Sequence, residues 1–106
     1  MVDTDLELRL LEPSDAGALA VLEAMVFPDA WDVDQFGQLL GQDRFLAVGA
    51  FKASGLCAYL TAYSVAAELE IVNVAVAPAL RGRGIGRALL LYFLEQGRKR
   101  GACRAV

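Results

Sequence analysis

One stretch near the end of the chain, VNVAVAPALRGRGIGRALL at residues 72–90, constrains the fold more than any other. It begins as a nearly unbroken run of apolar residues, which predicts a strand that Pro78 terminates. Glycines then stand at positions 82, 84 and 86, and an alanine- and leucine-rich stretch follows at once. The sequence therefore predicts a strand that enters a helix through a glycine-rich turn.

This turn has the chemistry of a phosphate cradle. The first N–H groups of a helix lack internal partners, and the helix dipole favours an anion beside them. Glycines allow close approach of the backbone to a ligand, and arginines at positions 81, 83 and 87 add positive charge. The alternative is that the glycines only let the helix pack tightly.

The known nucleotide-binding patterns do not fit the spacing of these glycines. A Walker loop needs a lysine followed by serine or threonine, and none follows here. In the dinucleotide pattern G-x-G-x-x-G, the third glycine stands one position later than Gly86 does here. That pattern also needs an acidic residue about 20 positions further on, and none stands there in this sequence. An RNA-binding RG segment is disfavoured because no row of exposed aromatic residues accompanies the arginines and the pI is about 4.8.

The rest of the chain reads as alternating elements of one mixed α/β fold with helices on both faces of a central sheet. Strands are predicted at residues 5–11, 45–51, 56–65, 68–76 and from 102 onward, and helices from Ser14 or Asp15 to 26, at 31–40 and at 85–100. The predicted order is β-α-α-β-β-β-α-β. The first helix is expected to bury Leu19, Leu22, Met25 and Val26, and Gly55 is expected to form a hairpin turn.

Composition indicates one domain with a true core, since 57% of the 106 residues are hydrophobic and the mean hydropathy is +0.44. No apolar run is long enough for a membrane span, and the N-terminus is acidic where a secretory signal would be basic. We therefore expect a soluble, cytoplasmic protein. The chain has no histidine, so no metal site and no His-based catalytic triad is expected. Cys57 and Cys103 lie among apolar residues and are expected to be buried free thiols.

Charge is divided unevenly along the chain, although the net charge is only −3. Acidic residues dominate the first part, at positions 3, 5, 7, 12, 15, 23, 29, 32, 34 and 43. Basic residues dominate the end, at positions 81, 83, 87, 98, 99, 100 and 104, where only Glu95 opposes them. This division predicts an anionic ligand for the C-terminal part. The cluster at 98–100 is better explained as helix C-terminal charge that complements the dipole.

The segment R-G-R-G-I-G, with V-A-V-x-P before it and an alanine-leucine helix after it, resembles the acetyl-CoA signature of the GNAT N-acetyltransferases. That signature is commonly written R/Q-x-x-G-x-G/A, and Arg81, Gly84 and Gly86 fill it. The resemblance runs over most of the chain and includes the order of elements. The RimI-type ribosomal-protein-alanine N-acetyltransferases are especially similar, through E-I-V-N-V-A-V-x-P and through Phe27-Pro28 followed by Trp31. Here Asp29-Ala30 separates that proline from the tryptophan, a departure in the segment that usually faces substrate.

The resemblance implies that acetyl-CoA is the co-substrate. The backbone of Gly82, Arg83, Gly84, Ile85, Gly86 and Arg87, together with Arg81, would receive its pyrophosphate, and Val74, Ala75 and Val76 would bind its pantetheine arm. A neutral amine would attack the acetyl group directly, without an acetyl-enzyme. The acceptor would be a protein or peptide N-terminal α-amine, such as that of a ribosomal protein. The alternatives are a small-molecule amine acetyltransferase and a non-catalytic acyl-CoA-binding or interaction module.

The general base is expected among the acidic residues at the start of the strand at 68–76. By simple alternation Glu70 shares the face of Val74, which makes it the candidate; the alternative is a surface charge at a strand end. That strand is apolar through its second half, which predicts burial on both faces. In the RimI type, the working glutamate and a tyrosine acid lie beyond the position of Val106. The resemblance thus implies an incomplete N-acetyltransferase domain over residues 1–106 with an exposed sheet edge. A homodimer through that edge is the hypothesis that follows. Neither a membrane nor a nucleic acid is an expected partner.

Overall fold

The protein is described by a computed structural model that covers residues 5–102 and 104–106. Its helices and strands are β1 (Glu7–Leu10), α1 (Ala16–Val26), α2 (Val33–Leu40), β2 (Phe45–Lys52), β3 (Gly55–Val65), β4 (Glu68–Val76), α3 (Ile85–Lys99) and β5 (Arg104–Ala105). Short 3-10 turns precede α1 (Pro13–Asp15) and α3 (Pro78–Leu80). The predicted order of elements is confirmed.

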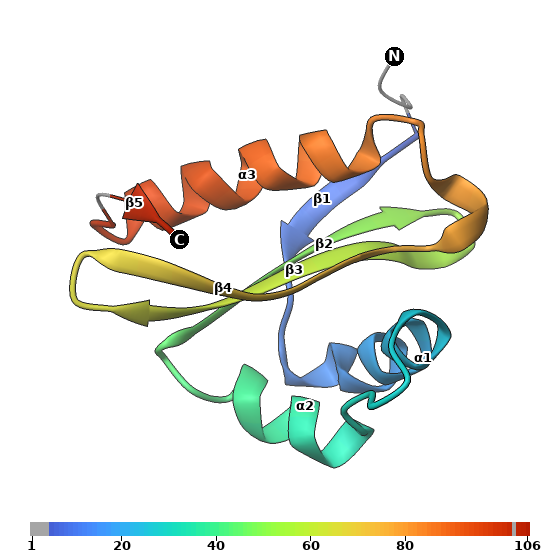
Figure 1. Cartoon of the computed structure of the whole chain (residues 1–106), viewed down its shortest axis with the longest axis horizontal. Coiled ribbons are helices and arrows are strands. Elements are labelled where there is room, and N and C mark those ends of the chain that lie inside the picture. Colours follow the sequence, from blue (N-terminus) through green and yellow to red (C-terminus); the bar gives the residue numbers. More distant parts are fainter. Residues whose placement is uncertain (1–4, 103) are drawn as a thin grey trace.

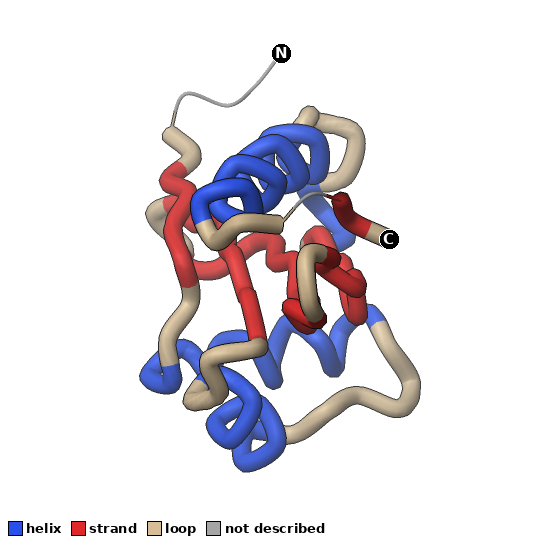
Figure 2. The backbone as a smooth tube through the Cα atoms, turned by 90° about the vertical axis from the view of Figure 1, so that its left-hand side faces the viewer, coloured by secondary structure: helices blue, strands red, loops and turns tan. Residues whose placement is uncertain are grey.

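The strands form one mixed sheet in the order β1-β2-β3-β4-β5. The strands β1 to β4 pair with one another in antiparallel fashion, whereas β5 runs parallel to β4. A parallel pair needs a crossover, and α3 supplies it. Helix α3 covers one face of the sheet while α1 and α2 lie on the other, as Figure 1 and the rotated view in Figure 2 show. The predicted α/β fold with helices on both faces is therefore confirmed.

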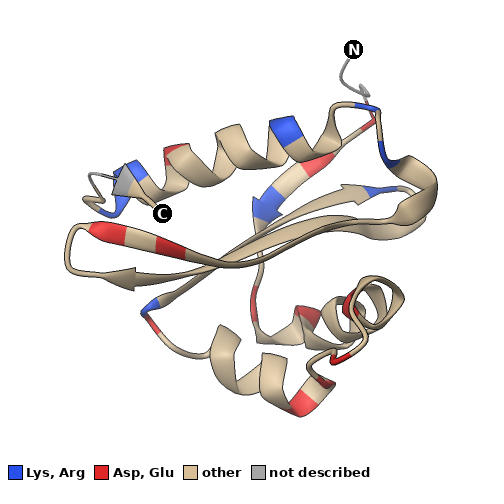
Figure 3. Cartoon of the chain, viewed as in Figure 1, with Lys and Arg blue, Asp and Glu red and all other residues tan. Residues whose placement is uncertain are grey.

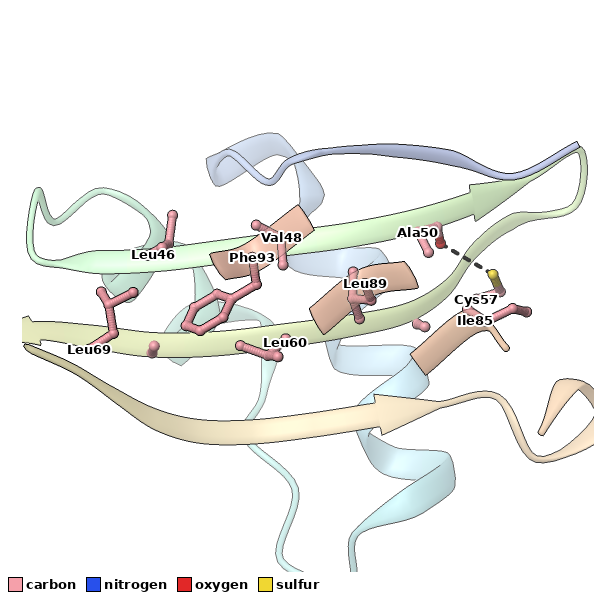
Figure 4. Packing of buried hydrophobic residues seen from close by; sticks show 11 residues of the cluster. Leu46, Val48, Ala50, Cys57, Leu60, Leu69, Ile85, Leu89 and Phe93 are labelled. Atoms are coloured by element: carbon pink, nitrogen blue, oxygen red, sulfur yellow. Dashed lines mark hydrogen bonds between the residues drawn. The ribbon is translucent and has the colours of Figure 1, made fainter. Parts of the chain in front are cut away.

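Each face of the sheet has its own hydrophobic core. Under α3, the side chains of Ile85, Leu89 and Phe93 pack against residues of β2 and β3 (Figure 4). On the opposite face, α1 and α2 pack against β2 and β3 through Leu19, Leu22 and Phe36, among others. Two cores on one thin sheet fix the register of its strands, since a slip by one residue would exchange the two faces.

The two predicted thiols have different outcomes. Cys57 is 2% exposed and lies in the core under α3, where its Sγ donates a hydrogen bond to the carbonyl oxygen of Ala50 at 3.3 Å. The predicted burial of Cys57 is confirmed, and its sulfur is not in a disulfide within the described residues. Cys103 lies outside the described residues.

Two sequence expectations about burial are wrong. Met25 is 60% exposed, and the buried face of α1 includes Glu23 instead. The second half of β4 is not covered on both faces, since Val74 is 46% exposed. The second half of β4 is exposed because it lies at the open side of the sheet. The helix expected at residues 31–40 begins at Val33, where Asp32 and Gln35 form a reciprocal capping box.

A partly buried ion pair fixes the approach of β1 to α1. The Asp15 carboxylate accepts two hydrogen bonds from the Arg9 guanidinium, both at 2.9 Å, and one from the N–H of Glu12 at 2.8 Å. The guanidinium also lies 4.1 Å above the ring of Phe51. The hydrogen bonds from Arg9 hold the pKa of Asp15 below its usual range, against the opposing effect of burial.

Gly97 of α3 is a packing requirement. A Cβ on Gly97 would overlap Cδ1 of Leu69 on β4, whereas a Cβ on Gly37 of α2 would have no atom within 4 Å among the described residues. We expect Gly97→Ala to lower the free energy of unfolding by about 1 kcal/mol, because displacing the buried Leu69 side chain costs more than the gain in helix propensity. Gly37→Ala should raise it by about 0.5–1 kcal/mol through helix propensity. Urea unfolding of both variants tests this, and equal effects in the two variants would contradict it.

The Asp15–Arg9 pair predicts a pH-dependent stability. Because the folded pKa of Asp15 is lowered, its contribution is present above the unfolded pKa and is lost as pH falls through the folded pKa. Asp15→Asn should therefore cost about 1 kcal/mol near pH 7, a modest value because Arg9 is partly exposed. The cost should shrink toward zero near pH 2. Urea unfolding of both proteins across this range measures the difference, and a cost independent of pH would refute the assignment.

Candidate functional site

A bulge in the middle of β4 sets the geometry of this strand. Thr61 of β3 pairs with Asn73 of β4, and the next residue of β3, Ala62, pairs with Ile71. Val72 of β4 is therefore the extra residue of the bulge. Directly opposed residues in an antiparallel pair share a face. The bulge therefore shifts the alternation along β4 by one residue.

The shift of alternation corrects one prediction about Glu70. Glu70 is paired with Tyr63, which packs on the α1–α2 side, whereas Val74 is paired with Leu60, which packs under α3. The expectation that Glu70 shares the face of Val74 is wrong, because simple alternation does not hold across a bulge. Glu70 is exposed on the α1–α2 side of the sheet.

The outer edge of β4 is open beyond the bulge. The N–H of Ile71 donates to the carbonyl of Val106 at 2.8 Å, and β5 pairs with β4 at Glu68 and Leu69. In the part of the chain that the structure describes, no strand pairs with residues 72–76 on that side. This half of β4 therefore offers main-chain groups to a ligand.

The predicted cofactor residues of β4 differ in which way their main chain faces. The N–H of Ala77 donates to Cys57 on β3 at 2.7 Å, while the carbonyl of Val76 accepts from Arg81 Nε at 3.3 Å. Because successive peptide groups point to opposite edges, the N–H groups of Val74 and Val76 face the open edge. The main-chain N–H and C=O of Ala75 point toward β3, and its side chain is only 3% exposed.

The glycine turn leads from this edge to the start of α3. Gly82 and Gly84 have φ of 81° and 78°, in the left-handed region that favours glycine. Gly84 is the N-cap of α3, and no side chain at that position accepts a hydrogen bond from the first turn of the helix. The N–H of Ala88 donates to the carbonyl of Gly84 at 3.1 Å. The N–H groups of residues 85–87, which form the first turn of α3, therefore have no acceptor within the helix and can donate to an anion.

Side chains around the turn divide into anchors and exposed charges. Ile85 is 1% exposed and fixes the first turn of α3 in the core. Arg81, Arg83 and Arg87 are exposed. Arg81 ties the turn to the end of β4, whereas neither Arg83 nor Arg87 forms an ion pair within residues 5–102 and 104–106. The last two cations are thus available to a ligand.

Charge is distributed by face as well as by sequence. Basic residues lie at both ends of α3 and in the loop before it, whereas the layer of α1 and α2 carries acidic residues (Figure 3). No lysine or arginine occurs from residue 10 to residue 43. The basic turn suits an anionic ligand, and the acidic layer suits a cationic one.

A buried carboxylate joins the acidic layer to β4, and sequence reasoning missed it. Glu23 of α1 is 1% exposed. Its Oε2 accepts from the N–H of Trp31 at 2.6 Å, and its Oε1 accepts from the hydroxyl of Tyr59 at 2.7 Å and from Nδ2 of Asn73 at 2.6 Å. Burial, and then the hydrogen bond to Glu23, raise the pKa of Tyr59 above its usual range. The only sequence signal was a single acidic residue within an otherwise apolar helix.

Other features of the described structure lie apart from this edge. A hollow of about 440 Å³ lies toward the C-terminal end of α3, beside β5, and includes Leu69, Leu94, Arg98 and Ala105 in its walls. Within the described ranges, no cluster of three or more Asp, Glu, Cys or His side chains could hold a metal. No helix there has the length and apolar character needed to cross a membrane.

Comparison with known proteins identifies the family. Residues 14–106 match the acetyltransferase (GNAT) family. The chain is 39% identical to streptothricin acetyltransferase of Streptomyces lavendulae over 84 residues, which are 73% of this chain and 43% of that protein. The chain therefore belongs to the GNAT acetyltransferase family, and its fold is the GNAT fold.

Two solved structures are similar in fold and share 26% sequence identity with the chain. The ribosomal-protein-S18-alanine N-acetyltransferase of Escherichia coli has a TM-score of 0.81, covering 92% of this chain and 62% of that one. An aminoglycoside acetyltransferase from an uncultured soil metagenomic sample has a TM-score of 0.80, covering 95% and 77%. The chain spans less than half the length of the curated relatives it matches, 25% and 43% of two of them.

The glycines of the turn differ in whether their backbone conformation requires a glycine. Gly84 has a positive φ, whereas Gly86 lies within α3 and a Cβ there would make an ordinary 3.8 Å contact with Val76. Gly84→Ala should lower the free energy of unfolding by about 1–2 kcal/mol. Gly86→Ala should raise it by about 0.5 kcal/mol. Chemical unfolding decides this; destabilisation of both variants to the same degree would contradict the described turn.

Proposed function

We propose that the protein transfers an acetyl group from acetyl-CoA to a primary amine. The observation that carries the proposal is the continuity between the open edge of β4 and the uncapped N-terminus of α3. An extended amide-containing chain that ends in a pyrophosphate matches such an arrangement, since the strand edge binds peptide-like groups and the helix start binds phosphate. Membership of the GNAT family supports the same substrate.

The geometry supports a division of roles among the predicted cofactor residues. The main-chain N–H groups of residues 82–87 and the guanidinium groups of Arg81, Arg83 and Arg87 would bind the pyrophosphate. Val74 and Val76 would bind the pantetheine arm through their outward main-chain groups. Ala75 and Ile85 would act as buried supports, because Ala75 faces β3 and the Ile85 side chain lies in the core.

The reaction would be a direct transfer between the two substrates. The neutral amine attacks the acetyl carbonyl carbon, a C–N bond forms, the C–S bond breaks and CoA leaves as its thiolate. N–H groups at the open edge of β4 would stabilise the negative charge that develops on the carbonyl oxygen. A base accepts the proton lost by the nitrogen. Glu70 stays a candidate for this base, reached through water, since it is exposed on the α1–α2 side.

The acceptor is proposed to be an amine that approaches from the acidic layer as its ammonium form and loses one proton to solvent before it attacks as the neutral amine. A protein N-terminal α-amine, of the ribosomal-protein-alanine kind, is the first candidate, supported by the 26% identical enzyme of Escherichia coli. The second candidate is a small-molecule amine, which the 39% identity with streptothricin acetyltransferase favours. Acidic residues near the loop between α1 and α2, such as Asp29 and Asp32, are compatible with either.

Calorimetric titration with CoA tests the cofactor part of the proposal. We expect Arg81→Ala to weaken CoA binding about tenfold, because it removes a charge at the turn and the tie to the carbonyl of Val76. Arg44→Ala is the matched control, since Arg44 is exposed and precedes β2, away from the turn. Its affinity should change less than about twofold. Equal losses in the two variants would indicate non-specific charge attraction.

Release of the CoA thiol measures the transfer itself. The wild-type chain is assayed with acetyl-CoA and a panel of peptides with alanine N-termini, their N-acetylated forms, and aminoglycoside and streptothricin amines. Turnover with free but not blocked peptides would support the first acceptor, and turnover confined to the small amines would support the second. Tight CoA binding without turnover on any acceptor would instead support an acyl-CoA-binding module.

A further inference from the structure

We propose that Glu23 is a positioning residue that holds the loop between α1 and α2 in register with the bulge of β4. The proposal rests on the acetyl-transfer function above, because it assigns the acceptor to the loop side and acetyl-CoA to the strand side. One carboxylate would then align the two substrate-binding parts of the site.

Glu23 forms a hydrogen-bonded bridge between two segments, and the first of them is the loop at residues 27–32. The N–H of Trp31 donates to Glu23 at 2.6 Å, one residue before the N-cap of α2. The ring of Trp31 packs edge-on against Phe36, with centroids 5.5 Å apart. The hydrogen bond and the ring contact together fix where the loop ends and α2 begins.

The second end is the bulge. Nδ2 of Asn73 donates to Glu23 at 2.6 Å, and the N–H of Asn73 donates to the hydroxyl oxygen of Thr61 at 3.2 Å. Side chains therefore determine the position of Asn73, where the regular ladder is interrupted. The next residue is Val74, whose N–H faces the open edge. Val74 is the residue of the open edge next to the bulge, so a shift of Asn73 would move the part of that edge proposed to meet the acetyl carbonyl at the end of the pantetheine arm.

The bridge works through hydrogen bonds rather than through an ion pair. The partners of Glu23 at Trp31, Tyr59 and Asn73 are neutral donors: a main-chain N–H, a phenol and an amide. Two of them can reverse, since the Asn73 amide can turn and the Tyr59 hydroxyl can accept. The N–H of Trp31 can only donate. A glutamine at position 23 could therefore keep the bridge, with its oxygen toward Trp31 and its amide toward Asn73, whereas a methionine could not.

These differences define the variants for the test. Glu23→Met keeps the approximate volume and removes both ends of the bridge. Glu23→Gln is the conservative variant expected to retain it. Tyr59→Phe is the matched control, because it removes a hydrogen bond to the same carboxylate but neither end of the bridge. Asn73→Ala removes only the β4 end and serves if Glu23→Met does not fold.

The first readout needs no substrate. Hydrogen exchange of the Trp31 amide, followed by NMR, should be about tenfold faster in Glu23→Met than in wild type. It should stay within about threefold of wild type in Glu23→Gln and Tyr59→Phe. Unchanged exchange in Glu23→Met would overturn the proposal, as would equal acceleration in Tyr59→Phe, which would indicate general destabilisation.

The second readout uses both substrates. We expect Glu23→Met and Asn73→Ala to raise the KM for the amine or lower kcat about tenfold, while the Kd for CoA changes less than about threefold. Glu23→Gln should restore most of the activity. Loss of activity in Glu23→Gln as large as in Glu23→Met would overturn the positioning role in favour of a proton-transfer role. If the wild type neither binds CoA nor transfers acetyl, the proposed function fails, and the exchange data still decide whether the bridge exists.

Discussion

The unequal pairing of β4 is the constraint on which the rest of the site depends. Its inner edge pairs with β3 along the strand, whereas its outer edge pairs with β5 only near its start. The bulge at Val72 marks the change from the paired half to the open half. Because the open half runs directly into the glycine turn and α3, one continuous surface offers strand-edge groups and then a helix N-terminus.

The two faces of the sheet give this edge its chemical polarity. The α3 side anchors the basic turn through buried residues such as Ile85, so exposed arginines stand at a rigid position. The α1–α2 side is acidic and carries Glu23 into the interior, where its hydrogen bonds reach both Trp31 and Asn73. The open edge of β4 therefore lies between a basic turn and an acidic layer.

Sequence patterns predicted the features that local chemistry controls. The order of elements, the turn at Gly84 and the start of α3 follow from periodicity and from glycine placement, which neighbouring residues decide. The bulge was hidden because a run of apolar residues looks the same in either register, and so the face of Glu70 was mispredicted. The burial of Glu23 depends on partners 8 to 50 residues away, which a single sequence does not reveal. The face of α1 that turns inward therefore includes Glu23 and leaves Met25 exposed.

A CoA titration followed by amide NMR tests the central claim most directly. If the open edge and the helix start bind the cofactor, the largest shifts should be those of the Val74 and Val76 amides and of residues 82–87. Ala75, which faces β3, should shift less than either neighbour. Shifts concentrated in the hollow beside β5, around Leu94 and Arg98, or no saturable shifts at all, would contradict the account.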